Sequence, residues 1–198
     1  SVVSGVNFTT QPVVIAVDDR GNIDTDFSGS VMLSENGSGS LTGTTSVTAS
    51  NGIATFSGVK YTSASDADAN FVLTAAAGSL VSATSASINP DVVATKLVFT
   101  TQPVPTAIQN GQSTSFTTVP VVQAVDANGM VDQDYTTNIV LSVTDPNDGT
   151  VDGTVNSFTV TSGDQDASST TVTLTPSGGI ATYSGLMIMY TNSGSSNT

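Results

Sequence analysis

The chain contains two copies of one sequence module, and this internal repeat limits the folds available to it. Residues 8–34 read FTTQPVVIAVDDRGNIDTDFSGSVMLS, and residues 116–142 read FTTVPVVQAVDANGMVDQDYTTNIVLS. Aligned at an offset of 108 without gaps, the two segments are identical at 14 of 27 positions. A second block, GIATFSGV at 52–59, matches GIATYSGL at 179–186 at an offset of 127. Because copies of one repeat form the same structural unit, the sequence predicts two similar modules.

Short segments of alternating apolar and polar residues predict β-strands, and no convincing helical pattern is present. The predicted strands are residues 12–17, 30–34, 45–49, 53–57, 70–75, 81–88 and 96–99. Asn51-Gly52 is a strong hairpin signal, and residues 76–79 predict a second hairpin turn. Short strands separated by turn residues every 8–12 positions are typical of a β-sandwich. The predicted fold class is all-β.

The junction between the modules is predicted at Asn89-Pro90-Asp91, which interrupts the strand pattern. This gives two domains, 1–91 and 92–198. The second copy carries 19 additional residues between its two conserved blocks, and we place them in a polar loop insertion near 144–171. The first copy lacks the segment that opens the second copy before its FTTVPVV block. The second copy lacks the last hairpin of the first.

Composition excludes several classes of function. The 198 residues include 3 Lys and Arg, 16 Asp and Glu, no His and no Cys, with a formal net charge of −13. A Cys/His zinc site, a His-based catalytic triad, a thiol nucleophile and a disulfide are therefore excluded. So few cations disfavour nucleic acid and anionic membrane surfaces as partners. No apolar run approaches the roughly 18 residues that span a bilayer. We expect neither an enzyme nor membrane insertion of this segment.

Several strings resemble the bacterial immunoglobulin-like repeats of invasin/intimin-type and giant adhesin surface proteins. They are FTTQPV, PVV.AVD..G..D.DF, V.LS, NGIATFSGV and LTAAAGSLVSAT. The resemblance implies two tandem immunoglobulin-like antiparallel β-sandwiches, each of about 100 residues. It also implies a spacer or stalk in a bacterial cell-surface or secreted adhesin-like protein. The expected partners are neighbouring copies of the repeat or protein, with any host or surface ligand bound elsewhere in the full-length chain.

The two incomplete copies leave an alternative open. Their ends are expected to be boundaries within a longer array, in which adjacent residues complete each module. The alternative is that neighbouring chains supply the missing strands. In that case the protein is a subunit of an extracellular filament or surface layer assembled by β-strand exchange. A carbohydrate-binding module is a weaker third reading, because the chain has no Trp to stack on a sugar.

Acidic residues recur at matched places in the two copies and are candidate Ca²⁺ ligands, since Ca²⁺ prefers several oxygen ligands from one loop. A further pair in the first copy has the spacing D-x-D-x-N, although it lacks the Gly and the distal Glu of an EF-hand. The candidate metal ligands are Asp18, Asp24, Asp26, Asp126, Asp132, Asp134, Asp66 and Asp68. Sites special to the second copy are Asp145, Asp148 and Asp152, or Asp164 and Asp166. The competing interpretation is that these carboxylates cap turns through Asx hydrogen bonds.

The repeat also predicts a core. The expected buried residues are Val13, Val14, Val17, Leu33, Phe56 and Val59, with Val121, Val122, Val125, Leu141, Tyr183 and Leu186 in the second copy. The apolar run Leu186–Met189 predicts a strand buried on both faces or an exposed docking edge.

Overall fold

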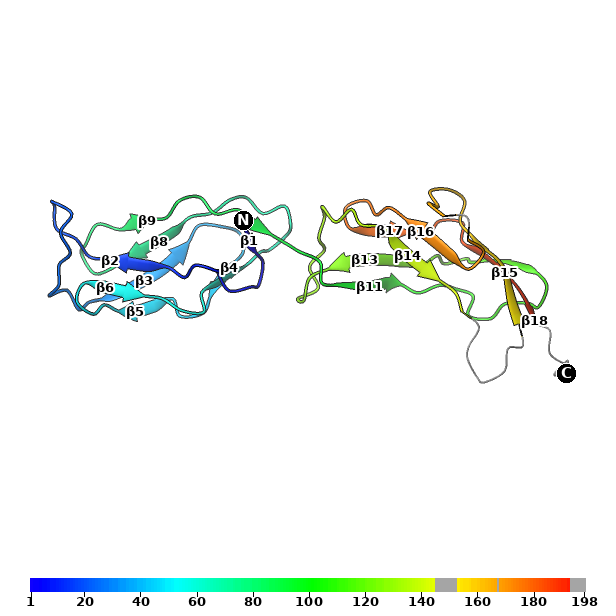
Figure 1. Cartoon of the computed structure of the whole chain (residues 1–198), viewed down its shortest axis with the longest axis horizontal. Helices are drawn as coiled ribbons and strands as arrows, with labels where there is room; N and C mark the ends of the chain where they lie inside the picture. Colours follow the sequence, from blue (N-terminus) through cyan, green and yellow to red (C-terminus); the bar gives the residue numbers. More distant parts are fainter. Residues whose placement is uncertain (145–152, 167, 193–198) are drawn as a thin grey trace. The chain divides into compact units, whose positions relative to one another are not determined.

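The structure, a computed structural model, describes residues 1–144, 153–166 and 168–192. The chain divides into two compact units. Unit 1 consists of Ser1–Val93 with Asp126–Met130, and unit 2 of Ala94–Val125 with Val131–Thr198. The described residues contain strands, turns and no helix, so the fold is all-β, as the sequence predicts (Figure 1). They include no long apolar helix of the kind that crosses a membrane.

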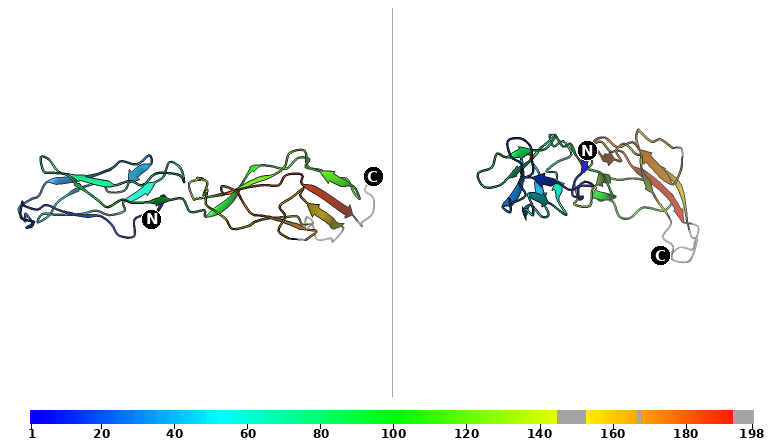
Figure 2. Two further views of the ribbon diagram at one scale, coloured as in Figure 1. Left: turned by 90° about the horizontal axis from the view of Figure 1, so that it is seen from above. Right: turned by 60° about the vertical axis from the view of Figure 1, so that its left-hand side comes forward.

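Unit 1 contains ten strands. They are β1 (Val2–Val3), β2 (Val13–Ile15), β3 (Ser30–Glu35), β4 (Ser40–Thr42), β5 (Ser46–Thr48), β6 (Ile53–Thr55), β7 (Lys60–Thr62), β8 (Leu73–Ala76), β9 (Ala83–Thr84) and β10 (Pro90–Asp91). The largest sheet has the order β5-β3-β8-β9, and smaller sheets pair β2 with β6 and β4 with β7. These pairings are antiparallel, whereas β1 and β10 pair in parallel. Strands lie on two sides of the unit, an arrangement of the β-sandwich type (Figure 2).

The core of unit 1 forms between these sheets. In β3 the inward residues are Val31 and Leu33, which alternate with exposed neighbours. They contact a cluster that includes Phe56, Val59 and Tyr61. Full burial of one such aliphatic or aromatic side chain stabilises a fold by about 1.5–3 kcal/mol. The Tyr61 ring stacks on Phe71 with centroids 4.0 Å apart.

The described residues of unit 2 form eight strands. They are β11 (Lys96–Thr101), β12 (Ser113–Ser115), β13 (Val121–Val125), β14 (Ile139–Ser142), β15 (Gly153–Thr159), β16 (Thr171–Leu174), β17 (Ile180–Thr182) and β18 (Met187–Asn192). The sheets have the orders β11-β13-β17, β12-β18-β15 and β14-β16, all antiparallel. The core contains Val122, Ile139, Val172, Tyr183 and Leu186.

The two copies make the same backbone hydrogen bonds at matched positions. The Phe56 amide donates to the Pro12 carbonyl at 3.0 Å, and the counterpart Tyr183 amide donates to Pro120 at 3.2 Å. Likewise Ala16 donates to Gly52 and Ala124 to Gly179. These bonds connect the first conserved block to the second in both copies. The offsets of 108 and 127 therefore describe real structural equivalence.

Two predicted elements differ from the structure. Asn51 and Gly52 do adopt positive φ values of 51° and 77° in a tight turn. Ser50 and Ile53 close the predicted turn as an antiparallel bridge with two backbone hydrogen bonds, of 2.9 and 3.0 Å. The hairpin pairing ends there, because β5 goes on to pair with β3 and β6 with β2. Within the predicted loop insertion, β15 is a strand paired with β18. A β-bulge between Val155 and Ser157 breaks its period-two pattern, which is why the sequence reads as a loop.

The predicted core is correct for Leu33, Phe56, Val59, Val122, Val125, Tyr183 and Leu186, which are buried. It is wrong for Val13 and Val17, whose side chains are exposed. Both lie on the outer face of the β2 segment, while Val14 between them packs on the core. Val121 and Leu141 are half-buried, and Leu141 packs against the core of unit 2.

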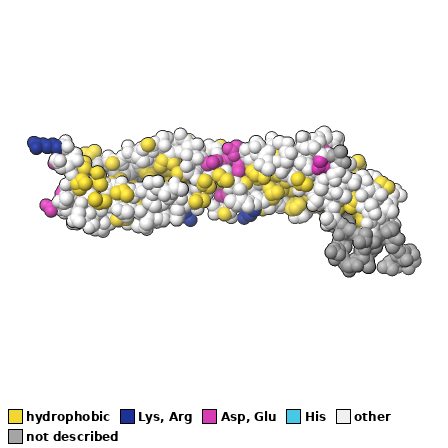
Figure 3. Space-filling model, in the orientation of Figure 1, with side chains coloured by type: hydrophobic (Ala, Val, Ile, Leu, Met, Phe, Trp, Pro, Cys, Tyr) yellow, Lys and Arg dark blue, Asp and Glu magenta, His cyan; other side chains and the backbone are white. Residues whose placement is uncertain are grey.

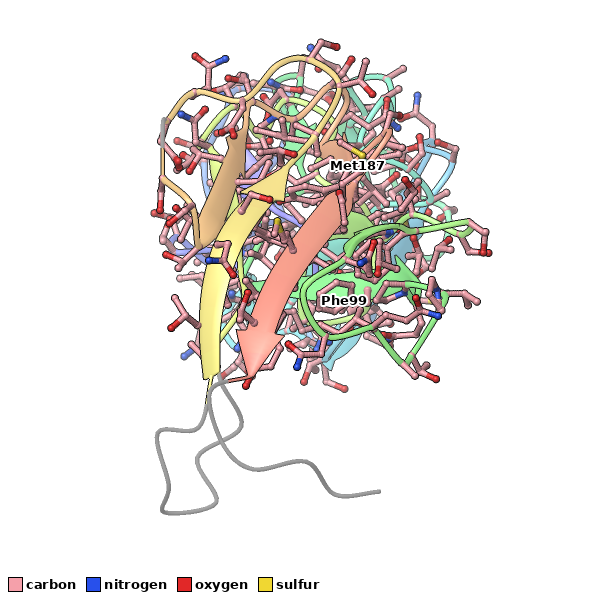
Figure 4. The ribbon with its side chains drawn as sticks, turned by 90° about the vertical axis from the view of Figure 1, so that its right-hand side faces the viewer. Phe99 and Met187 are labelled. Atoms are coloured by element: carbon pink, nitrogen blue, oxygen red, sulfur yellow. The ribbon has the colours of Figure 1, made fainter. Side chains whose placement is uncertain are left out.

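The apolar run Leu186–Met189 is neither a strand buried on both faces nor a free edge. Leu186 and Ile188 are buried, whereas Met187 lies partly exposed at the start of β18 (Figure 4). The strand pairs with β12 on one side and β15 on the other. Alternation with two paired neighbours accounts for this segment.

Candidate functional site

The first acidic turn is held together by the carboxylate of Asp18. Its Oδ1 accepts the backbone N–H groups of Arg20 and Asn22, each at 2.9 Å. Its Oδ2 accepts the Asn22 side-chain amide at 2.9 Å. The Asn22 side chain, followed by the Asn22 and Arg20 amides, lowers the pKa of Asp18 below its ordinary value. Both oxygens are thus committed to N–H donors.

The matched turn of the second copy has the same design. Asp126 Oδ1 accepts the amides of Asn128 and Met130 at 2.9 and 2.8 Å, and Oδ2 accepts the Asn128 side chain at 3.1 Å. In both turns the carboxylate occupies the same backbone position, because the amides of Asp18 and Asp126 donate to Asn22 and Met130. Asp18 and Asp126 therefore act as Asx caps, as the competing interpretation expects.

The following acidic pairs differ between the copies. In the first copy, Asp24 Oδ1 accepts the Asp26 amide at 3.2 Å, which closes a short turn. In the second, the buried Asp132 Oδ2 accepts the Ala94 amide at 2.7 Å. Asp132 Oδ1 is buried and has no hydrogen-bond partner among the described residues. A carboxylate oxygen of Asp134 lies within 4.8 Å of one on Asp132.

The D-x-D-x-N segment of unit 1 also binds backbone amides. Asp66 Oδ1 accepts the Val92 amide at 2.9 Å. Asp68 accepts the amides of Ala64 and Ser65 at 2.7 and 3.1 Å. Burial raises the pKa of Asp68, but the hydrogen bonds from Ala64, Ser38 and Ser65 outweigh it and lower the pKa overall. Asp66 and Asp68 thus cap different segments.

The candidates special to the second copy divide into two groups. Asp164 Oδ1 accepts the Thr173 amide at 3.0 Å, and Asp166 Oδ1 accepts the Ser168 amide at 2.9 Å. The hydroxyl of Thr173 donates to Asp166 and is the largest contribution that lowers the pKa of this carboxyl. Asp145, Asp148 and Asp152 lie outside the described residues.

A second kind of candidate site is the open edge of β2 in unit 1. The counterpart of β2 in unit 2 is β13, which pairs with β11 on one side and with β17 on the other. In unit 1, β6 takes the place of β17, but no strand of the described residues takes the place of β11. The peptide groups of Pro12 and Ala16 bond toward β6, so by alternation those of Val13 and Ile15 face the open edge.

An apolar groove runs along this edge. It has a volume of about 630 Å³, and residues from β2, β3, β8 and β9 line it, among them Val14, Leu33, Leu73 and Ala83. A second groove of about 390 Å³ shares Val14, Ile15, Ala75 and Ala83 with the first and extends to Leu80. Hydrophobic side chains reach the surface in patches along unit 1 (Figure 3). Sequence reasoning identified the missing strand but not the groove, whose walls are brought together only by the sheet pairing.

The described residues of unit 2 differ from unit 1 in the sheet that contains β14. In unit 1, β3 pairs with both β5 and β8. Within residues 1–144, 153–166 and 168–192, its counterpart β14 pairs with β16 alone, and no hairpin there is equivalent to β8 and β9.

Comparison with known proteins gives no assignment. No protein-family model matches the chain, and neither a curated protein nor a solved structure matches it significantly. The fold defines the chain as an all-β protein of the β-sandwich type.

Proposed function

We propose that the chain consists of two tandem immunoglobulin-like modules that act as a spacer or stalk in a bacterial cell-surface or secreted adhesin-like protein. The observation that carries this proposal is that the repeated residues have structural roles. The matched aspartates Asp18 and Asp126 cap turns, and the matched aromatics Phe56 and Tyr183 fill cores. A repeat whose shared residues cap turns and fill the core is suited to a structural role.

The chemistry of the chain supports a non-enzymatic role. It has no His and no Cys, and its capping carboxylates accept hydrogen bonds that favour their ionised form. A general acid would instead need a raised pKa. The low content of basic residues and the abundance of Ser and Thr suit an extracellular location, with neighbouring repeats as partners.

The spacer proposal is tested with proteins that carry one, two and three head-to-tail copies of residues 1–198. We expect the maximum dimension from small-angle X-ray scattering to rise by a constant increment per copy, with unchanged thermal unfolding. A maximum dimension that stays nearly constant, because the copies collapse on one another, would contradict the proposal. Antibody labelling of intact cells that produce the full-length protein tests the location, and labelling only after permeabilisation would contradict it.

A second candidate function is favoured by the open edge of β2. A strand edge beside an apolar groove is suited to accept a strand from another chain. On this alternative the protein is a subunit of an extracellular filament or surface layer built by β-strand exchange. Sedimentation velocity distinguishes the two candidates. A filament subunit forms a growing series of oligomers as its concentration rises, whereas a spacer stays monomeric.

We also propose that Asp132 and Asp134 bind a Ca²⁺ ion through their carboxylates. The buried Asp132 Oδ1 has no hydrogen-bond partner among the described residues, and a buried carboxylate oxygen without one is energetically costly. A hard cation held by two carboxylates would offset that cost. Asp18 and Asp126 are poor candidates, because N–H donors already surround their oxygens.

A further inference from the structure

We propose that the parallel pair of β1 and β10 is a mechanical clamp, which resists the unfolding of unit 1 when the chain is under tension. The proposal rests on the spacer or stalk function and names the element that bears the load. The two strands are Val2–Val3 and Pro90–Asp91, and both lie within unit 1.

The direction of the two strands decides how tension acts on them. Among the described strand pairs of unit 1, β1 and β10 are parallel, whereas the others are antiparallel. The chain enters β1 at Val2 and leaves β10 at Asp91, and in a parallel pair these two points lie at opposite ends. Tension between them therefore pulls the strands past each other along their common axis. In an antiparallel pair both points would lie at one end, and the same tension would peel the strands apart.

Two backbone hydrogen bonds cross this axis. The amide of Val2 donates to the Asn89 carbonyl and the amide of Ser4 donates to the Asp91 carbonyl, each at 2.8 Å. Sliding the strands stretches both bonds together, whereas peeling loads one bond at a time. A load shared between bonds gives a higher barrier to rupture, and forced unfolding is governed by that barrier rather than by equilibrium stability.

Each strand is also anchored to the rest of unit 1. After β1, the Gly5 amide donates to the Tyr61 carbonyl at 2.8 Å, and Tyr61 is fully buried in β7. After β10, the Val92 amide donates to Asp66 Oδ1 at 2.9 Å, and the Val92 side chain is fully buried. A load on either strand therefore reaches the core of the unit.

The position of β10 in the chain places it on the path of any tension. Residues 92–95 connect β10 directly to β11, so tension that passes along the chain into Ala94–Val125 leaves unit 1 through β10. Among the described residues, the sheet that contains β10 consists of β1 and β10 alone. The bonds to β1 are thus the ladder that must break before β10 leaves the unit.

Pulling the same pair from two directions tests the proposal. DNA handles are attached through introduced cysteines, and the natural chain has no Cys to interfere. In the variant Ser1→Cys/Val93→Cys the handles lie at opposite ends of the pair and load it in shear. The matched control is Val6→Cys/Val93→Cys, in which both handles lie at the same end and peel the strands apart. All three replaced side chains are exposed, and residues 94–198 lie outside both loaded segments.

The unfolding force of unit 1 is measured with optical tweezers at one pulling rate. We expect a higher mean force for the shear variant than for the control, although urea unfolding gives the two variants the same stability. Equal mean forces, or a lower force in shear, would overturn the clamp. That result would leave the spacer function standing, because X-ray scattering and cell labelling test it without applied force.

Proline substitution tests whether the resistance lies in the backbone bonds. In the Ser1→Cys/Val93→Cys protein, Val2→Pro removes the amide that donates to Asn89. Val3→Pro is the matched control, because alternation along the strand directs the Val3 amide away from β10. We expect the mean unfolding force to fall for Val2→Pro and to stay close to that of the parent for Val3→Pro. An equal fall in both variants, or no fall for Val2→Pro, would overturn the backbone clamp.

Discussion

The backbone carbonyl of Asp24 packs against Cα of Gly52, so closely that a Cβ at Gly52 would overlap its oxygen. Gly52 has a φ of 77°, in the left-handed region that favours glycine. Its counterpart Gly179, with a φ of 72°, stands in the same relation to Asp132. In both copies the absence of a side chain on this glycine allows its turn to lie directly against the backbone of Asp24 or Asp132.

Replacement of this glycine is therefore expected to destabilise its unit. A side chain at positive φ costs about 1–2 kcal/mol by itself, and the overlap with the Asp24 carbonyl adds to that cost. We expect Gly52→Ala to lower the free energy of unfolding by more than about 2 kcal/mol, measured by urea denaturation. Gly21→Ala is the matched control, because Gly21 has a φ of 84° but no atom within 4 Å of the added Cβ. Equal losses for the two variants would show that the close approach contributes nothing.

Asp18 should make part of the free energy of unfolding depend on pH in the acidic range. Its pKa is below the ordinary value of 3.8, so the folded state binds its proton less readily than the unfolded state. The stabilisation is present above the ordinary value and is lost as the pH falls through the lowered pKa. We expect Asp18→Asn to reduce the slope of unfolding free energy against pH below about 4. Asp19→Asn removes the same charge one residue away, and an identical change of slope would contradict the assignment.

The sequence predicts the features that depend on local chemistry. The Asp18 and Asp126 turns could be expected because Asp and Gly recur at fixed places, and Leu33 and Phe56 could be assigned to the core from alternation. The pairing of β5 with β3 could not be predicted, since an Asn-Gly turn specifies a reversal but not which sheet each strand joins. Val13 and Val17 are wrongly predicted for a different reason: side chains alternate between the two faces of a strand, and with Val14 on the core both valines project from the outer face.

The candidate site was predicted only in outline. Aspartates in matched turns are visible in the sequence, but whether each carboxylate meets an amide or is left without a partner depends on distant backbone. Asp132, for example, bonds the amide of Ala94 through one oxygen only. The grooves beside β2 require β8 and β9 to be placed, and those strands have no counterpart in the described part of the second copy.

Tyr183 should make part of the free energy of unfolding depend on pH in the alkaline range. Its hydroxyl donates to the Ile139 carbonyl at 3.0 Å, and burial raises its pKa from 10.0 to about 12. Because the folded-state pKa is raised, the stabilisation is complete below pH 10 and is lost as the pH rises toward 12. We expect Tyr183→Phe to cost about 1 kcal/mol at neutral pH through the lost hydrogen bond. It should also flatten the decline in stability above pH 10, and an unchanged alkaline profile would contradict this origin.

Calcium should stabilise the protein through Asp132. A ligand that binds only the folded state raises the unfolding free energy by about 2.7 kcal/mol at a hundredfold excess over its dissociation constant. We therefore expect the melting temperature to be higher in millimolar Ca²⁺ than in chelator, and Asp132→Asn to abolish that difference.

Asp126→Asn is the matched control, because the oxygens of Asp126 already accept amide hydrogens and its removal should leave the calcium shift intact. The calcium increment, rather than the melting temperature itself, is compared, since either variant alters stability without calcium. An increment lost in Asp126→Asn and kept in Asp132→Asn would place the ion in the capped turn and contradict the proposal.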